Sequence, residues 1–168
     1  MRFRTPLSIL GLVTFAAATA LAHPHFNKTI TVALPGGAEA KVSYNTTPAN
    51  ESRAESAAAG AFVTPRSPRL ELSADVTAGD QTLAAGEYTI GVLKGEDGEW
   101  TMALHPGRVG RGADPDMSKV IRLDSAYSAD AGVAEHMLID VTPGSGALEG
   151  KVVLTLHFGS MFLSGVLD

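Results

Sequence analysis

The stretch that decides the fold runs from Arg69 to His105 and reads RLELSADVTAGDQTLAAGEYTIGVLKGEDGEWTMALH. Apolar and polar residues alternate along it, and short turns rich in glycine and aspartate interrupt the alternation. A repeat of two residues is typical of β-strands that bury one face. The turn at residues 95–98 (GEDG) predicts a hairpin, after which Trp100, Met102 and Leu104 share one face of the next strand. We therefore expect antiparallel β-structure with a core around these three side chains.

The same pattern of short strands and turns continues on both sides of this stretch. We expect an all-β fold, an antiparallel β-sandwich of Greek-key or jelly-roll type with about nine short strands. The first two strands are predicted to form a hairpin, because a Pro-Gly-Gly turn separates them. The strands expected outside residues 69–105 are 29–34, 40–44, 119–123, 136–141, 151–158 and 161–167.

The segment from Thr47 to Pro68 has a different composition, rich in alanine, serine, proline and glutamate. We expect it to cross the surface between the two sheets. Within it, the alanine-rich run Ala54–Ala61 predicts one or two helical turns.

The overall composition excludes several classes of protein. The chain has 168 residues, 45% of them apolar and 18% charged, with a net charge of -5 and no cysteine. This length fits one domain with a sizeable core. The acidic balance argues against a nucleic-acid partner, which needs a basic surface. The absence of cysteine excludes disulfides, thiol catalysis and cysteine zinc sites.

The first 22 residues have the three parts of a secretory signal peptide. Arg2 and Arg4 precede the apolar run Leu7–Ala18, and residues 20–22 (ALA) form a small-x-small cleavage site. The apolar run is too short to span a membrane as a helix, and no later run is longer. We expect residues 1–22 to be removed and residues 23–168 to form a single domain. This product should be secreted or periplasmic, with no membrane span.

The order of short motifs resembles a bacterial family known as domain of unknown function 2911. In that order a corner at residues 75–77 (DVT) precedes the short strand 81–83 (QTL), and residues 85–88 (AGEY) are similar to the family segment PAGTYSL. A strand beginning Trp100-Thr101 follows. The family pattern V-x-Y-S-x-P and its closing strands also have counterparts, at Val42-Ser43-Tyr44 with Pro48 and at Leu154–Leu163.

The resemblance implies an exported β-rich domain and no particular chemistry. Where the family carries Arg-Thr-Gly-Ala-Asn before the central strand, this chain has Pro65-Arg66-Ser67-Pro68-Arg69. Because the family has no established activity, no site residues are carried over from it.

Histidines are the residues on which chemistry could be built. Cleavage after Ala22 would leave a chain that begins His23-Pro24-His25. An amino-terminal histidine offers an imidazole and the α-amino group, and one further imidazole completes a three-nitrogen copper site called a histidine brace. Pro24 weakens the alternative amino-terminal copper and nickel motif, because that motif needs the backbone N–H that proline lacks. The residues proposed as metal ligands are His23, His25, His105 and His157. By alternation, His105, His136 and His157 each lie on the more polar face of their strands.

The chain contains no complete catalytic constellation. It has no Gly-x-Ser-x-Gly elbow and no carboxylate pair at a spacing that singles out glycoside chemistry. We therefore expect a non-enzymatic binding or structural module without a cofactor, whose partner is an unidentified ligand or protein. The alternative hypothesis is a periplasmic copper-binding protein that uses the histidine brace. A hydrolase whose residues meet only in the folded chain is a third possibility.

Overall fold

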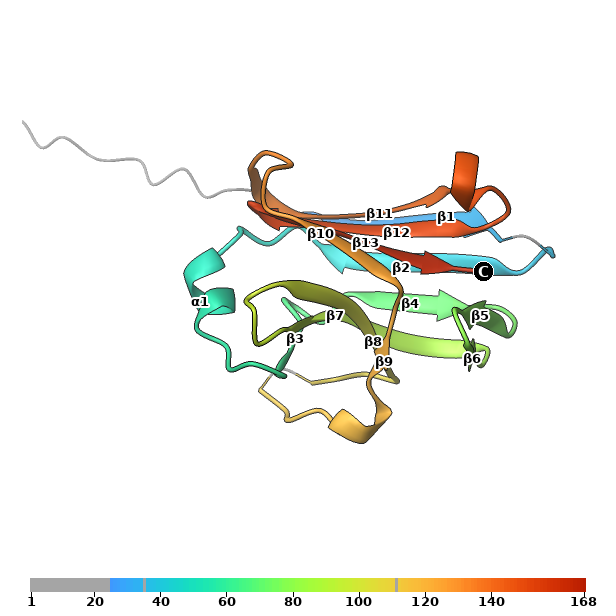
Figure 1. The fold of residues 1–168 in the computed structure, drawn as a ribbon. Helices are drawn as coiled ribbons and strands as arrows, with labels where there is room; N and C mark the ends of the chain where they lie inside the picture. The colour runs from blue at the N-terminus through green and yellow to red at the C-terminus, as the bar shows by residue number, and fades with distance from the viewer. Residues whose placement is uncertain (1–24, 35, 111) are drawn as a thin grey trace, which may run out of the picture.

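The computed structural model describes residues 25–34, 36–110 and 112–168, and it shows an antiparallel β-sandwich (Figure 1). The predicted signal peptide and His23 lie outside the described residues. The strands are β1 (Asn27–Ala33), β2 (Glu39–Asn45), β3 (Phe62–Val63), β4 (Arg69–Leu72), β5 (Val76–Ala78), β6 (Gln81–Leu83), β7 (Gly86–Lys94), β8 (Trp100–Pro106), β9 (Ile121–Arg122), β10 (Ser125–Ser128), β11 (Ala134–Pro143), β12 (Val152–Gly159) and β13 (Met161–Leu167), with one short helix α1 (Glu51–Glu55).

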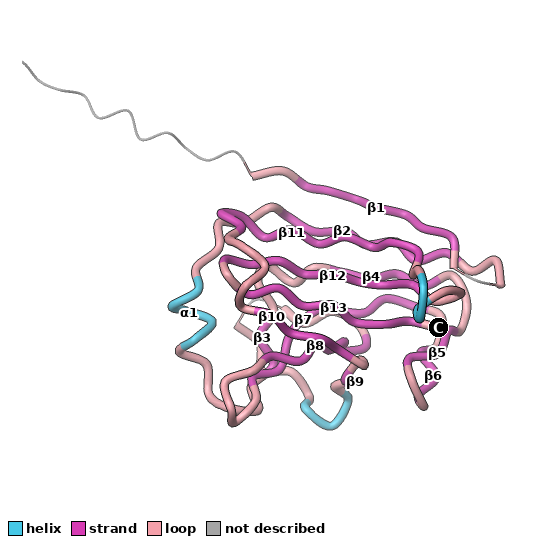
Figure 2. Tube along the Cα trace, turned by 45° about the horizontal axis from the view of Figure 1, so that its top comes forward, coloured by secondary structure: helices cyan, strands magenta, loops and turns pink. Residues whose placement is uncertain are grey.

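Two sheets form the layers of the sandwich. The first has the strand order β1-β2-β4-β7-β8-β9, with β3 added beside β7, and the second has the order β10-β13-β12-β11. In the second sheet three consecutive strands form hairpins while β10 lies beside the last of them, which is a Greek-key arrangement. The strands β5 and β6 form a small separate ribbon. Figure 2 shows β1 at the edge of the molecule, beyond β2 and β11.

The core fills the space between the two sheets, as the alternation predicts. Trp100, Met102 and Leu104 are buried on the inner face of β8. They belong to one apolar cluster with residues of the second sheet, including Leu154 and Leu163. The expected first hairpin is also present, since β1 pairs with β2 in antiparallel register.

The two sheets join at a seam just after β2. Met137 N–H donates to the Thr47 carbonyl at 2.8 Å, and Ala49 N–H donates to the Glu135 carbonyl at 2.9 Å. Residues 47–49 therefore leave the first sheet and pair with the start of β11. This seam places β1 and β11 side by side at one edge of the sandwich.

The structure differs from the expected elements mainly in short segments. Thirteen strands are present among the described residues, because two-residue and three-residue strands such as β3 and β9 are too short to show a period. The helix lies over residues 51–55, because the Asn50 side chain accepts a hydrogen bond from Arg53 N–H and caps it. Most of the alanine run at residues 54–61, where helical turns are predicted, is therefore not helical. The strand expected over 119–123 is reduced to β9, since residues 117–119 form a 3-10 turn. Within the described ranges no helix is long and apolar enough to cross a membrane.

Candidate functional site

An open groove of about 710 Å³ lies where β1 approaches the second sheet, and we call it the β1–β11 groove. Its volume is in the range of small-molecule binding sites. Its lining comes from residues 27–30 of β1, Tyr44 of β2, residues 138–140 of β11, Thr155 and His157 of β12, and Phe162 of β13.

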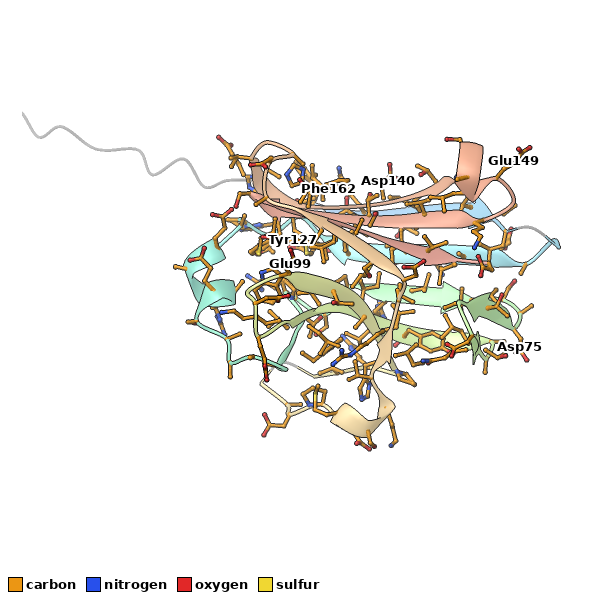
Figure 3. All side chains as sticks on the ribbon, in the orientation of Figure 1. Asp75, Glu99, Tyr127, Asp140, Glu149 and Phe162 are labelled. Carbon is orange, nitrogen blue, oxygen red and sulfur yellow. The ribbon has the colours of Figure 1, made fainter. Side chains whose placement is uncertain are left out.

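Strand register explains why distant residues line one surface. Leu138 pairs with His157, and His157 pairs with Phe162, so these three side chains form a row across three strands. Asp140 and Thr155 form the next row. Figure 3 shows Phe162 and Asp140 pointing away from the first sheet, on the outer face of the second.

The groove combines apolar surface with two charges of opposite sign. Leu138 is 43% exposed although it is a large apolar residue. Lys28 lies on one wall and Asp140 on the other. One carboxylate oxygen of Asp140 accepts a hydrogen bond from Val141 N–H at 2.8 Å. Such a surface suits a ligand that has an apolar body and a polar end.

Two further exposed apolar side chains are sequence neighbours of residues that line or contact the groove. Phe26 is 59% exposed and directly precedes the lining residues of β1. Val133 is 77% exposed and follows Gly132, whose carbonyl lies 3.3 Å from His157 Nε2.

His25 and His136 meet at the end of the groove where the two sheets join. Their ring centres are 6.4 Å apart and the planes are inclined by 67°. His25 Nδ1 lies 3.0 Å from the Thr46 carbonyl oxygen. Because a carbonyl can only accept, Nδ1 carries the proton, and Nε2 of the neutral ring keeps its lone pair.

His157 contributes to the groove itself. Its ring meets the Phe162 ring edge-on, with centres 5.5 Å apart. Its Nε2 atom lies beside the Gly132 carbonyl, just as His25 Nδ1 lies beside the Thr46 carbonyl. These two ring nitrogens therefore contact backbone oxygens rather than a nucleophile.

His105 lies on the opposite side of the molecule. It is on the outer face of the first sheet, where its ring centre is 6.3 Å from that of Phe62. Both of its ring nitrogens are buried, and neither has a hydrogen-bond partner among the described residues. His105 and His157 therefore cannot share one ligand, although alternation places each on the more polar face of its strand.

The proposed metal ligands are thus only partly brought together. The structure places His25 beside His136, which is not among the ligands proposed from the sequence, and His23 lies outside the described residues. Within the described ranges, no group of three or more histidine, aspartate or glutamate side chains is arranged to hold a metal ion. His25 and His136 lie together because residues 47–49 pair with β11, and no local sequence pattern predicts that pairing.

Three side chains outside the groove have shifted pKa values, and structural contacts explain each shift. Burial raises the pKa of Tyr88, with a smaller contribution from the Asp75 carboxylate. A hydrogen bond and the positive charge of Lys41 lower the pKa of Glu71. The Ser118 hydroxyl is the main cause of the lowered pKa of Asp116.

The chain matches no protein-family model, no curated protein and no solved structure. Any functional conclusion therefore depends on the groove and the histidines described above.

Proposed function

We propose that this chain is an exported β-sandwich module that binds a ligand in the β1–β11 groove without transforming it. The observation that carries the proposal is the groove itself, which is large enough for a small molecule. Its lining includes the exposed Leu138 and the half-buried Phe162, together with Lys28 and Asp140. Small-molecule sites typically combine apolar walls with a few placed polar groups.

The chemistry of the walls favours an amphiphilic ligand. The row from Leu138 to Phe162 offers apolar and aromatic contact, while Lys28 offers a cation to an acidic group. The signal-like segment at residues 1–22 and the resemblance to domain of unknown function 2911 support export, to the periplasm or the exterior.

A fluorescent amphiphile tests the groove directly. Anilinonaphthalene sulfonate has an apolar ring system and an anionic group, so it should bind between Leu138 and Lys28. We expect Leu138→Ser to weaken dye binding by about fivefold or more, because apolar contact area is lost. Met117→Ser is the matched control, since Met117 is 46% exposed and lies outside the groove lining. Equal affinities for the two variants would overturn the assignment of the groove.

A second candidate function is copper binding through the mature amino terminus. The observation that favours it is the position of His136, a histidine from another strand, beside His25. In the sequence, His23 comes two residues before His25. Two imidazoles and an α-amino group form a nitrogen-rich set that suits Cu(II).

The copper hypothesis is tested with the processed protein and a variant that carries an extra alanine before His23. The extension moves the α-amino group away from His23. Stronger Cu(II) binding by the unextended chain, measured by titration calorimetry, supports the brace. Equal binding by both forms, or binding by neither, would contradict it.

A further inference from the structure

We propose that His25 and His136 are a pair of ligands for a divalent transition-metal ion, with Cu(II) the ion bound most tightly. The proposal deepens the copper hypothesis by naming the side chains that hold the ion at the seam. It differs from the brace in one respect, because the pair does not require the α-amino group.

The spacing of the two rings suits a shared ion. An ion held by two imidazoles from opposite sides keeps the ring centres about 6 Å apart, because each metal–nitrogen bond is about 2 Å long and each centre lies about 1 Å beyond its nitrogen. The observed separation of the ring centres is 6.4 Å. The two rings are therefore already at about the separation that a shared ion requires.

His25 is held in the tautomer that binds a metal. The bond from its Nδ1 to the Thr46 carbonyl directs the Nε2 lone pair away from the backbone. Metal-binding histidines commonly make this kind of second contact, which fixes both the ring and its proton.

The backbones that carry the two histidines are tied to the same short segment. Phe26 N–H donates to Thr46 Oγ1 at 2.9 Å, and Thr46 N–H donates to the Phe26 carbonyl at 2.8 Å. On the other side, the bonds from Met137 to Thr47 and from Ala49 to Glu135 hold the residues that flank His136. Hydrogen bonds therefore hold the backbone next to both histidines, which is the kind of support that a metal site needs.

The class of ion follows from the ligand type. Neutral imidazoles suit Cu(II), Ni(II) and Zn(II), and affinity for nitrogen sites peaks at Cu(II) along the first-row series. With two protein ligands, the remaining positions are left to water or to the amino-terminal residue. An ion bound here would link the start of β1 to the start of β11, and so fasten the two sheets at the end of the groove.

The alanine-extended protein provides the test, because its α-amino group is removed from His23. Cu(II) alone is the probe, with electron paramagnetic resonance to count coordinating nitrogens and thermal unfolding to report stabilisation. We expect Cu(II) to raise the melting temperature and to show imidazole nitrogen coupling. We expect His25→Gln and His136→Gln each to weaken binding by about tenfold or more. His157→Gln is the matched control and should bind as the parent does.

The outcomes separate this pair from the brace and from the groove ligand. If the alanine-extended protein binds Cu(II) and both His25→Gln and His136→Gln abolish that binding, the pair is supported and the α-amino group is not required. Binding that is lost on extension and unchanged by His136→Gln overturns the pair while leaving the brace. No binding in any form overturns both, and dye binding in the groove is unaffected by that result. Because His25 is exposed, His25→Gln remains informative even if His136→Gln does not fold.

Discussion

His105 is the residue whose surroundings fit its chemistry least well. Its two ring nitrogens are buried without partners among the described residues, beside Phe62. A buried polar atom without a hydrogen bond is destabilising, whereas an apolar group of the same shape is not. We expect His105→Phe to raise the free energy of unfolding by about 1 kcal/mol, measured by urea denaturation. Destabilisation would show that an unseen group satisfies these nitrogens in solution.

Tyr88 gives the protein a dependence on alkaline pH. Its hydroxyl donates to the Ala84 carbonyl at 2.7 Å, and burial raises its pKa above 10.0. The folded state therefore holds this proton more tightly than the unfolded state. The resulting stability is complete below about pH 10 and is lost as the pH rises through the folded-state pKa.

The Tyr88→Phe variant tests this dependence of stability on pH. Below about pH 9 it should be less stable by about 1 kcal/mol, because the Ala84 carbonyl loses its donor. Above about pH 10 the difference from the wild type should shrink, because only the wild type then loses this stabilisation. Urea unfolding at the two pH values measures the difference, and a constant gap would refute the linkage.

At the scale of elements, the hairpin between β12 and β13 holds helix α1 in place. Gly159 in the hairpin turn has a φ of +64°, and the Glu51 side chain occupies the space where a Cβ atom would lie. The Glu51 carboxylate accepts a hydrogen bond from Ser160 N–H. The glycine is thus required both by its backbone conformation and by the helix that packs on it.

Replacing this glycine separates the two requirements. We expect Gly159→Ala to lower the free energy of unfolding by about 2 to 3 kcal/mol, from positive φ and from displacement of Glu51. Gly150→Ala is the control for φ alone, since Gly150 has a φ of +82° and open space at its Cβ position. We expect the control to cost about 1 to 2 kcal/mol. Equal effects in chemical denaturation would show that Glu51 moves aside freely.

At the scale of the whole molecule, the two sheets pack so closely that some positions between them have no room for a larger side chain. Gly165 lies on the inner face of β13, opposite β8. A Cβ atom there would lie 2.8 Å from Leu123 Cδ1 and 2.9 Å from Met102 Sδ. We expect Gly165→Ala to destabilise the fold by about 1 to 3 kcal/mol through overpacking. The neighbouring Ser164→Ala, on the outer face, should change stability by less than about 0.5 kcal/mol in the same unfolding experiment.

Local patterns predicted the fold class and one layer of the core. Alternation depends only on neighbours along the chain, so it assigned Trp100, Met102 and Leu104 to the buried face of β8, where the structure has them. The same rule placed His105 and His157 on the opposite faces of their strands. Alternation does not predict which sheet a strand joins, so it could not show that His105 and His157 lie on opposite sides of the sandwich.

The sequence by itself determined that the chain forms an antiparallel sandwich with a mostly aliphatic core, because burying one face of each strand demands an alternating pattern. Only the tertiary structure decided the site. His25 and His136 meet because residues 47–49 pair with β11, and Leu138, His157 and Phe162 form one row because of strand register. Register and strand order arise from contacts between residues far apart in the chain, and no periodicity within a single strand records them.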